Sequence, residues 1–252
     1  MRPMPSKVSA LIIAVAFGLP SLRTWGAEIN WLDVESRIQY GYYTEDERAL
    51  ASVLEILKPA ENDSASRSYY AGLANYRLTQ LVLARDKGKA KDSASACVSS
   101  LDKALDMKKD FADALALQSA CLDELARLEA WRTPFASSKS GSRIEKARHL
   151  APKNPRVLLM DAVGIYGRSK DTAPDRDKAL LAFKQAATAF EAERQEAEHF
   201  PGWGAAEAYM YLGRCYLERG AALEARDALE RALLIAPEFA EARRLMTKIT
   251  SG

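Results

Sequence analysis

The sequence predicts an all-α fold, an α-solenoid of stacked antiparallel helix hairpins with irregular insertions. Alanine, leucine, glutamate, arginine and lysine dominate the composition, glycine is scarce at 13 of 252 residues, and no segment alternates long enough to form a strand. A helix–turn–helix joint also recurs along the chain, and its best copy has small residues where two helices must approach closely. Such a hairpin cannot bury its apolar face alone, so it implies neighbouring copies.

The N-terminal segment is of a different kind. Residues 1–7 are basic, residues 8–19 form a short apolar core, and residues 20–27 end in small side chains. This is the layout of a secretory signal peptide, and the apolar run is too short to span a bilayer. We therefore expect residues 1–27 to be removed after Ala27, with an uncleaved N-terminal anchor as the alternative.

The rest of the chain, residues 28–252, is expected to form one elongated solenoid domain. No cysteine lies near the end of the apolar run, so we expect no lipoprotein anchor. The mature protein is expected to be exported to the bacterial periplasm or cell envelope, soluble and without stable membrane insertion after signal removal.

Joints between helices recur at three places. Residues 104–114, 147–157 and 232–242 align as copies of one helix–turn–helix joint, and a weaker joint at residues 54–59 precedes the pair Ala71 and Gly72. The copies are unevenly spaced. Insertions in solenoids map to loops or lengthened helices on one face, so we expect such insertions between the joints.

Composition predicts where these insertions lie. Residues 133–142 are rich in Ser, Gly and Pro and are expected to form a loop, as are residues 167–175, with a helix from about Arg176. Residues 87–93 have a similar but more charged composition. Residues 178–198 have helical spacing and predict a long second helix.

A Gly- and Pro-containing segment, residues 199–204, breaks this long helix. We expect Trp203 within it to fill the gap between the long helix and the last repeat. An exposed tryptophan that stacks on a ligand is the alternative.

The clearest repeat unit covers residues 206–239. Gly213 lacks bulk where its two helices must approach, and larger side chains fill the flanking space. Residues 240–250 then predict a helix that caps the solenoid, although its partly apolar face would also suit an oligomer contact. The unit's pattern consists of Tyr209, Leu212, Gly213, Tyr216, Ala225, Leu229, Ala232 and Pro237.

On these residues the chain resembles tetratricopeptide repeat (TPR) proteins, strongly over residues 206–242 and more weakly back to about residue 45. The resemblance implies a right-handed superhelix in which the first helix of each pair lines a concave groove. In that family the groove holds peptides or helices of partner proteins. The resemblance therefore implies a binding scaffold, without naming the partner.

Positions around each small seam residue predict the groove. The predicted groove residues are largely apolar and aromatic, which suits a helix or an extended peptide. Only Arg214 matches the polar residues with which some family members clamp a carboxylate. The alternative is that insertions fold back and make these positions core. The groove set is Tyr69, Leu73, Tyr76, Leu159, Val163, Tyr166, Met210, Arg214 and Leu217, and the seam set is Gly72, Gly213, Ala225, Ala232 and Pro237.

Catalysis and nucleic-acid binding find little support in the sequence. The 36 Lys and Arg and 34 Asp and Glu are scattered, whereas a nucleic-acid footprint needs a clustered basic face. The two histidines, His149 and His199, lie far apart, and no metal-ligand spacing, phosphate loop or nucleophile motif is present. We expect no enzyme, no metal and no cofactor. Acidic pairs such as Asp123 with Glu124, and Glu196 with Glu198, are expected to be solvated.

Three cysteines are too few for a disulfide framework. Cys97 and Cys215 are interpreted as small buried side chains. A bridge between Cys97 and Cys121 would join successive helices, and the sequence leaves it open.

Two functions follow. The favoured one is a non-catalytic scaffold for protein–protein interaction that holds a partner peptide or helix in an apolar concave groove. The alternative is a periplasmic binding protein that encloses a small hydrophobic ligand, in association with a transporter.

Overall fold

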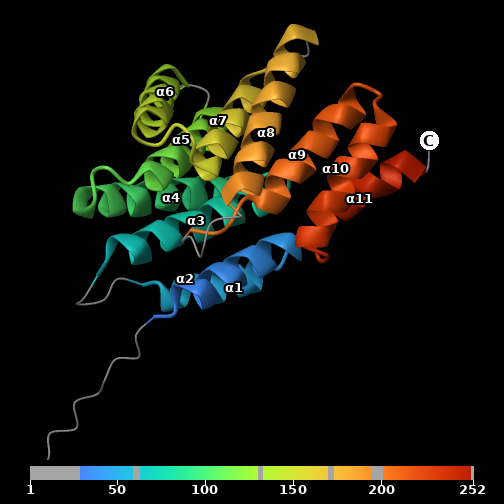
Figure 1. Cartoon of the computed structure of the whole chain (residues 1–252). Coiled ribbons are helices and arrows are strands. Elements are labelled where there is room, and N and C mark those ends of the chain that lie inside the picture. Colours follow the sequence, from blue (N-terminus) through green and yellow to red (C-terminus); the bar gives the residue numbers. More distant parts are fainter. Residues whose placement is uncertain (1–28, 59–62, 130–132, 170–172, 194–200, 251–252) are drawn as a thin grey trace, which may run out of the picture.

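The computed structural model describes residues 29–58, 63–129, 133–169, 173–193 and 201–250, and all regular structure in these ranges is helical (Figure 1). The predicted all-α solenoid is confirmed. None of the described helices is long and apolar enough to cross a membrane. The helices are α1 (Trp31–Tyr43), α2 (Glu47–Ile56), α3 (Ala65–Val82), α4 (Lys87–Met107), α5 (Ala112–Leu128), α6 (Thr133–Leu150), α7 (Pro155–Arg168), α8 (Ala173–Glu193), α9 (Ala205–Glu218), α10 (Ala222–Ile235) and α11 (Ala240–Thr250).

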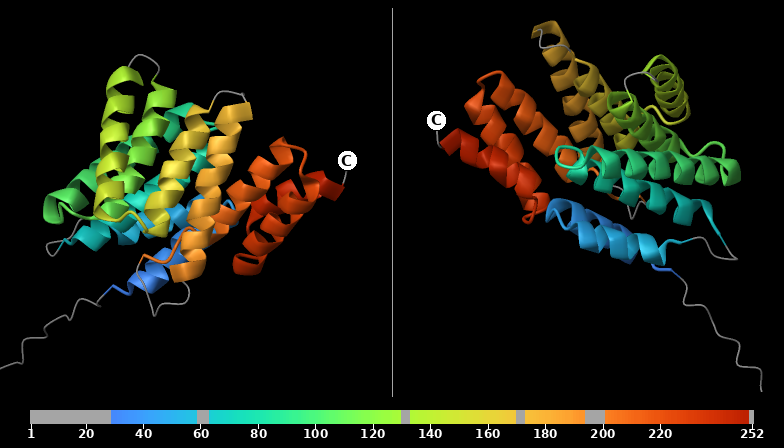
Figure 2. Two further views of the ribbon diagram at one scale, coloured as in Figure 1. Left: turned by 45° about the horizontal axis from the view of Figure 1, so that its top comes forward. Right: turned by 180° about the vertical axis from the view of Figure 1, so that it is seen from behind.

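Consecutive helices pair into five hairpins, from α1–α2 to α9–α10, and α11 packs against the last pair (Figures 1 and 2). The two ends of the solenoid also meet. The Tyr43 ring centroid on α1 lies 4.5 Å from that of Phe239, which precedes α11. Arg244 on α11 pairs with Glu45 at 2.5 Å. The superhelix therefore closes upon itself.

The seams within hairpins are tight. A Cβ atom on Gly72 would lie 2.6 Å from Leu101 Cγ, and one on Gly213 would lie 2.5 Å from Leu229 Cγ. Ala225 and Ala232 are fully buried. Since α10 ends at Ile235, Pro237 follows the helix end and is exposed.

Residues 87–93, expected to be a loop, form the first two turns of α4. The Asp86 carboxylate accepts a hydrogen bond from the Lys89 backbone N–H at 2.9 Å and so caps the helix. Ala90 is fully buried, which anchors the same turn. A helix cap and one buried alanine outweigh the loop-like composition.

The loop expected at residues 133–142 is also wrong, because these residues form the first half of α6, which packs along α5. Proline is tolerated in the first turn of a helix, and Ser140 in this stretch is buried. The loop expected at residues 167–175 is shorter than predicted: α7 continues to Arg168 and α8 begins at Ala173. The long helix expected over residues 178–198 is described as far as Glu193.

A disulfide joins Cys97 on α4 to Cys121 on α5, with their Cα atoms 6.2 Å apart. The interpretation of Cys97 as a plain buried side chain is therefore incomplete. Cys215 is free and buried, and burial raises the pKa of its thiol to about 12.

The expectation of solvated acidic pairs fails for Glu124. Its side chain is buried beside Arg127, and burial raises the pKa of its carboxyl group. Asp123 accepts a hydrogen bond from Arg168 at 2.8 Å. The reason is that α5 is enclosed by neighbouring helices, so even its polar positions meet protein. Residues 1–27, Glu196, Glu198 and His199 lie outside the described residues.

Candidate functional site

The predicted concave groove is mostly core. Tyr166, Arg214 and Leu217 remain partly exposed, and Arg214 donates a hydrogen bond to Glu241 at 2.7 Å. The other six positions are at most 9% exposed, which corrects the expectation of an open groove. They are Tyr69, Leu73, Tyr76, Leu159, Val163 and Met210.

A buried ion pair lies on the face of the predicted groove residues, which we call the concave face; its Arg77 guanidinium carbon lies 5.8 Å from the ring centroid of Tyr76. Arg77 on α3 pairs with Glu207 on α9, and each residue is 1% exposed. Gln39 and Tyr43 on α1 donate hydrogen bonds to Glu207 at 2.9 and 2.8 Å. The Arg77 guanidinium carbon also lies 4.2 Å from the ring centroid of Tyr42. We call Gln39, Tyr42, Tyr43, Arg77 and Glu207 the clasp. The first helix of the chain, rather than the insertions, thus occupies the groove.

Trp203 completes this filling from the segment before α9. It is 2% exposed, and its indole N–H donates to the Tyr69 hydroxyl at 2.8 Å. The exposed ligand-stacking alternative is wrong, and Trp203 reaches α3 across the molecule. Gly204 makes this placement possible: its φ is +115°, and a Cβ atom there would lie 2.5 Å from the Phe190 ring.

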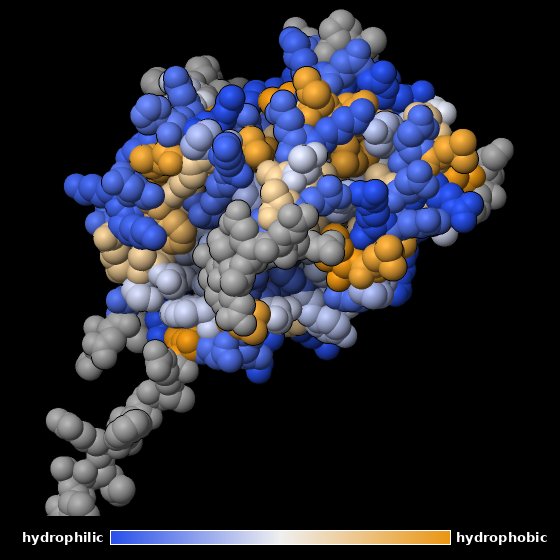
Figure 3. Space-filling view, viewed as in Figure 1, coloured by the Kyte–Doolittle hydropathy of each residue, from blue (hydrophilic) through white to orange (hydrophobic). Residues whose placement is uncertain are grey.

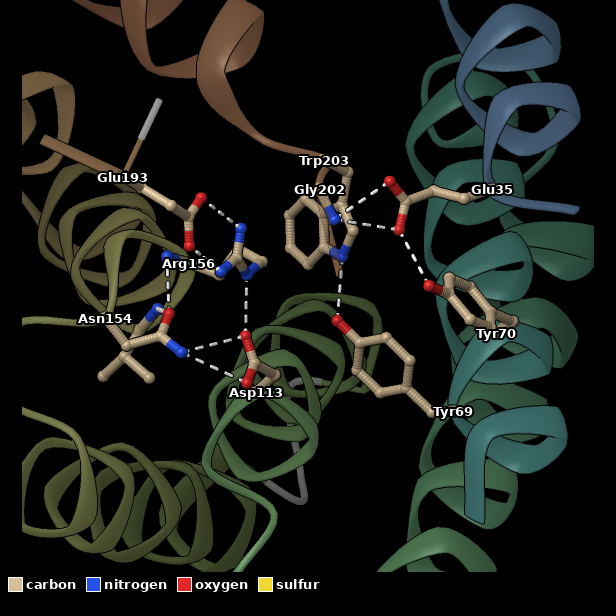
Figure 4. A network of polar contacts seen from close by, with 10 residues as sticks. Glu35, Tyr69, Tyr70, Asp113, Asn154, Arg156, Glu193, Gly202 and Trp203 are labelled. Atoms are coloured by element: carbon tan, nitrogen blue, oxygen red, sulfur yellow. Dashed lines mark hydrogen bonds and ion pairs between the residues drawn. The ribbon is translucent and has the colours of Figure 1, made fainter. Parts of the chain in front are cut away.

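Two polar clusters flank Trp203 (Figure 4). In the first, the Gly202 N–H donates to both Glu35 oxygens at 3.0 and 3.1 Å, and the Tyr70 hydroxyl donates to Glu35 at 2.9 Å. Burial raises the pKa of Glu35 above its ordinary value. The carboxylate is therefore satisfied within the chain.

In the second cluster, the buried guanidinium of Arg156 lies between two carboxylates. Its Nε donates to Asp113 at 2.8 Å, and its terminal nitrogens pair with Glu193. Asn154 donates to Asp113 at 3.2 Å and caps α7 through its side-chain oxygen. A single buried cation is thus shared by two carboxylates.

These clusters lie at one edge of the solenoid, where each hairpin is joined to the next. We call this the junction edge; it contains residues 108–111, 151–154 and 201–202. An aromatic pocket of about 880 Å³ opens there. Trp31 stacks on Tyr70 with ring centroids 5.6 Å apart, and Tyr69 packs on Phe111 at 4.8 Å.

The aromatic pocket has a buried floor and a partly exposed rim. Tyr69, Tyr70 and Glu35 are buried, whereas Trp31 and Phe111 are only partly buried. Lys108 is exposed, and its Nζ lies 4.8 Å from the Phe111 ring centroid. The pocket therefore offers aromatic surface with one cation at its rim.

A second hollow, the basic groove, lies beside the aromatic pocket and measures about 900 Å³. Arg148, Lys153 and Lys184 are exposed along it, while Leu158 and Ala189 contribute apolar surface. Pro201 lines both hollows. The face shown in Figure 3 is mainly hydrophilic, with hydrophobic residues in separate small patches.

Sequence reasoning missed most of this site. Trp31, Glu35 and Lys108 carried no motif, and Phe111 was identified only as part of a recurring joint. The sequence offered one signal for this site, namely the aromatic residue Trp31 directly after Asn30, which caps α1. No group of three or more His, Cys, Asp or Glu among the described residues is placed to hold a metal ion.

Comparisons with solved structures identify the fold. A thermophilic TPR protein of Thermus thermophilus is similar, with a TM-score of 0.55 and 17% identity over 88% of this chain and 100% of that chain. The fold is that of a TPR protein. The assembly chaperone of RpL4 (Acl4) aligns over 88% of this chain and 96% of its own at 15% identity, but its TM-score of 0.38 adds nothing to that conclusion. No family model and no curated protein sequence matches the chain.

Proposed function

We propose that this TPR-type solenoid is a non-catalytic interaction scaffold that holds a partner polypeptide at its junction edge. The observation that carries the proposal is the aromatic pocket, whose rim residues Trp31 and Phe111 are only partly buried. Aromatic side chains with one exposed face are enriched at protein interfaces, since they supply apolar area at little entropic cost.

The filled concave face supports this choice of site. A partner in the groove would have to displace the clasp and separate Arg77 from Glu207. Each buried charge would then lack its partner, which is costly. Binding at the junction edge requires no such rearrangement. Among the predicted groove residues, Tyr166, Arg214 and Leu217 stay candidates for a secondary contact.

Export is part of the proposal. Residues 1–27 have the layout of a signal peptide. The Cys97–Cys121 disulfide supports the same view, because disulfides persist in oxidising compartments such as the bacterial periplasm and are rare in the cytosol.

A small hydrophobic ligand is the second candidate. Ligand sites commonly measure about 300–1,000 Å³ and combine apolar walls with a few polar groups. The aromatic pocket falls in this range, and Glu35, Lys108 and Asn30 are among the polar residues along it.

The test compares the wild-type protein with Trp31→Ala, using Tyr40→Ala on the same helix as a matched control because Tyr40 is 57% exposed and outside the pocket. Each mature protein is isolated gently from the envelope of its source organism and weighed by native mass spectrometry. We expect a co-isolated polypeptide with the wild type and with Tyr40→Ala, and a several-fold loss with Trp31→Ala.

Equal recovery of the polypeptide with all three proteins would contradict the site. An added mass of a few hundred daltons that disappears only with Trp31→Ala would instead support the small-ligand candidate. Circular dichroism of each variant checks that the fold is retained.

A further inference from the structure

The junction edge carries cations that no carboxylate of the described residues neutralises. Within the described residues, Lys108, Lys153 and Lys184 have no carboxylate partner; Lys108 lies over Phe111, and the Nζ of Lys184 lies 5.4 Å from the Tyr216 ring centroid. By contrast, Arg148 at the same edge pairs with Asp161 at 3.2 Å. The unpaired cations are thus three lysines around the two hollows.

The carboxylates of the same region already have hydrogen-bond or ion-pair partners within the chain. Glu35 accepts from Gly202 and Tyr70, and Asp113 and Glu193 hold Arg156. Arg156 offsets one of these three negative charges, and the hydrogen bonds to Glu35 come from neutral groups. Among the described residues, five cations line the two hollows against these three carboxylates, so the lining has an excess of positive charge. The cations are Lys108, Arg148, Lys153, Arg156 and Lys184.

The two hollows adjoin each other. Pro201 lines both, and Phe111 of the aromatic pocket and Asp113 of the basic groove lie two residues apart at the start of α5. A single extended segment can thus place a ring in the aromatic pocket while its flanking residues lie along the lysines.

We infer that the partner presents an extended acidic segment with an aromatic or large apolar residue within it. The ring enters the pocket formed by Trp31, Tyr70 and Phe111, and carboxylates on either side lie beside Lys108 and beside Lys153 and Lys184. This inference rests on the proposed function and adds the chemical class of the partner. Charge complementarity at such a rim mainly sets specificity and association rate.

The test uses fluorescence anisotropy with three labelled peptides and the mature protein. The probe is Asp-Glu-Phe-Glu-Asp, and its controls are Lys-Arg-Phe-Arg-Lys, which reverses the charge, and Asp-Glu-Ser-Glu-Asp, which lacks the ring. We expect the probe to bind most tightly, the ringless peptide more weakly, and the basic peptide weakest. Added salt should weaken binding of the probe, because exposed charges are screened.

Lysine variants locate the contact. Lys108→Gln, Lys153→Gln and Lys184→Gln should each weaken binding of the probe by about two- to fivefold, as expected for exposed ion pairs. Lys103→Gln is the matched control, because Lys103 is exposed on α4 and lies outside both hollows. It should leave binding unchanged.

The outcomes separate this inference from the proposed function. Equal binding of the acidic and basic peptides, with loss in Trp31→Ala, would overturn the acidic class and leave the aromatic site standing. Acidic binding that is indifferent to Trp31→Ala would contradict the pocket itself. A single-stranded oligonucleotide that binds more tightly than the probe through the same lysines would replace the acidic peptide with a nucleic acid.

Discussion

The concave face and the junction edge use the same kinds of side chain in opposite ways. On the concave face, Arg77 and Glu207 are 1% exposed and paired, and Trp203 is buried and donates a hydrogen bond to Tyr69. At the junction edge, Trp31 is partly exposed and Lys108 has no carboxylate partner among the described residues. Residue type alone therefore does not distinguish packing from binding, whereas burial and pairing do.

Closure of the superhelix explains the difference. The first hairpin contacts the C-terminal end through Tyr43 with Phe239 and Glu45 with Arg244. This brings α1 across the concave face, where it supplies Gln39 and a hydroxyl group to Glu207. The face that the family resemblance assigns to partners is occupied by the chain itself.

The strongest test of the comparison breaks the clasp. Glu207→Ala leaves the buried Arg77 guanidinium without its carboxylate and should lower the free energy of unfolding by about 3–5 kcal/mol. Urea denaturation followed by circular dichroism measures it. The double variant Arg77→Met with Glu207→Leu should recover most of the loss, because it removes both buried charges.

Glu230→Ala provides the matched control, since Glu230 forms an exposed pair with Arg226 on α10. It should change stability little. An equally small loss of unfolding free energy for Glu207→Ala would mean that water reaches the clasp and that the concave face is open.

A seam substitution gives the next largest effect. Gly213→Leu places side-chain atoms where a Cβ alone would lie 2.5 Å from Leu229 Cγ, and should destabilise the fold by about 1–3 kcal/mol. Gly141→Ala on α6 is the control, because no atom lies within 4 Å of its Cβ position. Thermal unfolding should show a lower midpoint temperature for Gly213→Leu, and an unchanged or slightly higher one for Gly141→Ala. An unchanged midpoint for Gly213→Leu would refute the tight seam.

The smallest effect concerns Glu35, which lies between the two regions. Burial raises its pKa in the folded protein above the ordinary value of 4.5, so the folded state holds this proton more tightly than the unfolded state. Its contribution to stability is complete below about pH 4.5 and is lost as the pH rises through the raised pKa. Glu35→Gln does not titrate.

The unfolding free energy of Glu35→Gln relative to the wild type should therefore increase as the pH rises across this window. Denaturation at a series of pH values measures the trend. A constant difference between the two proteins across the series would contradict the raised pKa: the carboxylate would then be solvated, or its hydrogen bonds from Gly202 and Tyr70, which lower the pKa, would offset burial.

Local sequence patterns were sufficient for the helices and the repeat, and insufficient for the site. The pattern around Gly213 reports contacts within one hairpin, which recur at a fixed spacing. The loop predictions at residues 87–93 and 133–142 were wrong because caps and packing against neighbouring helices outweigh composition. The contact between Arg77 and Glu207 joins residues 130 positions apart, and no local pattern encodes it.

By itself, the sequence determined the all-helical solenoid, the C-terminal helix α11 and the small residues at the seams, since these depend on contacts between residues close in the chain. Only the tertiary structure decided that α1 and Trp203 fill the concave face, that Cys97 and Cys121 are bridged, and that Trp31 and Phe111 share a pocket. These features depend on how far each hairpin turns relative to the next, which is a sum of small packing angles over the whole molecule.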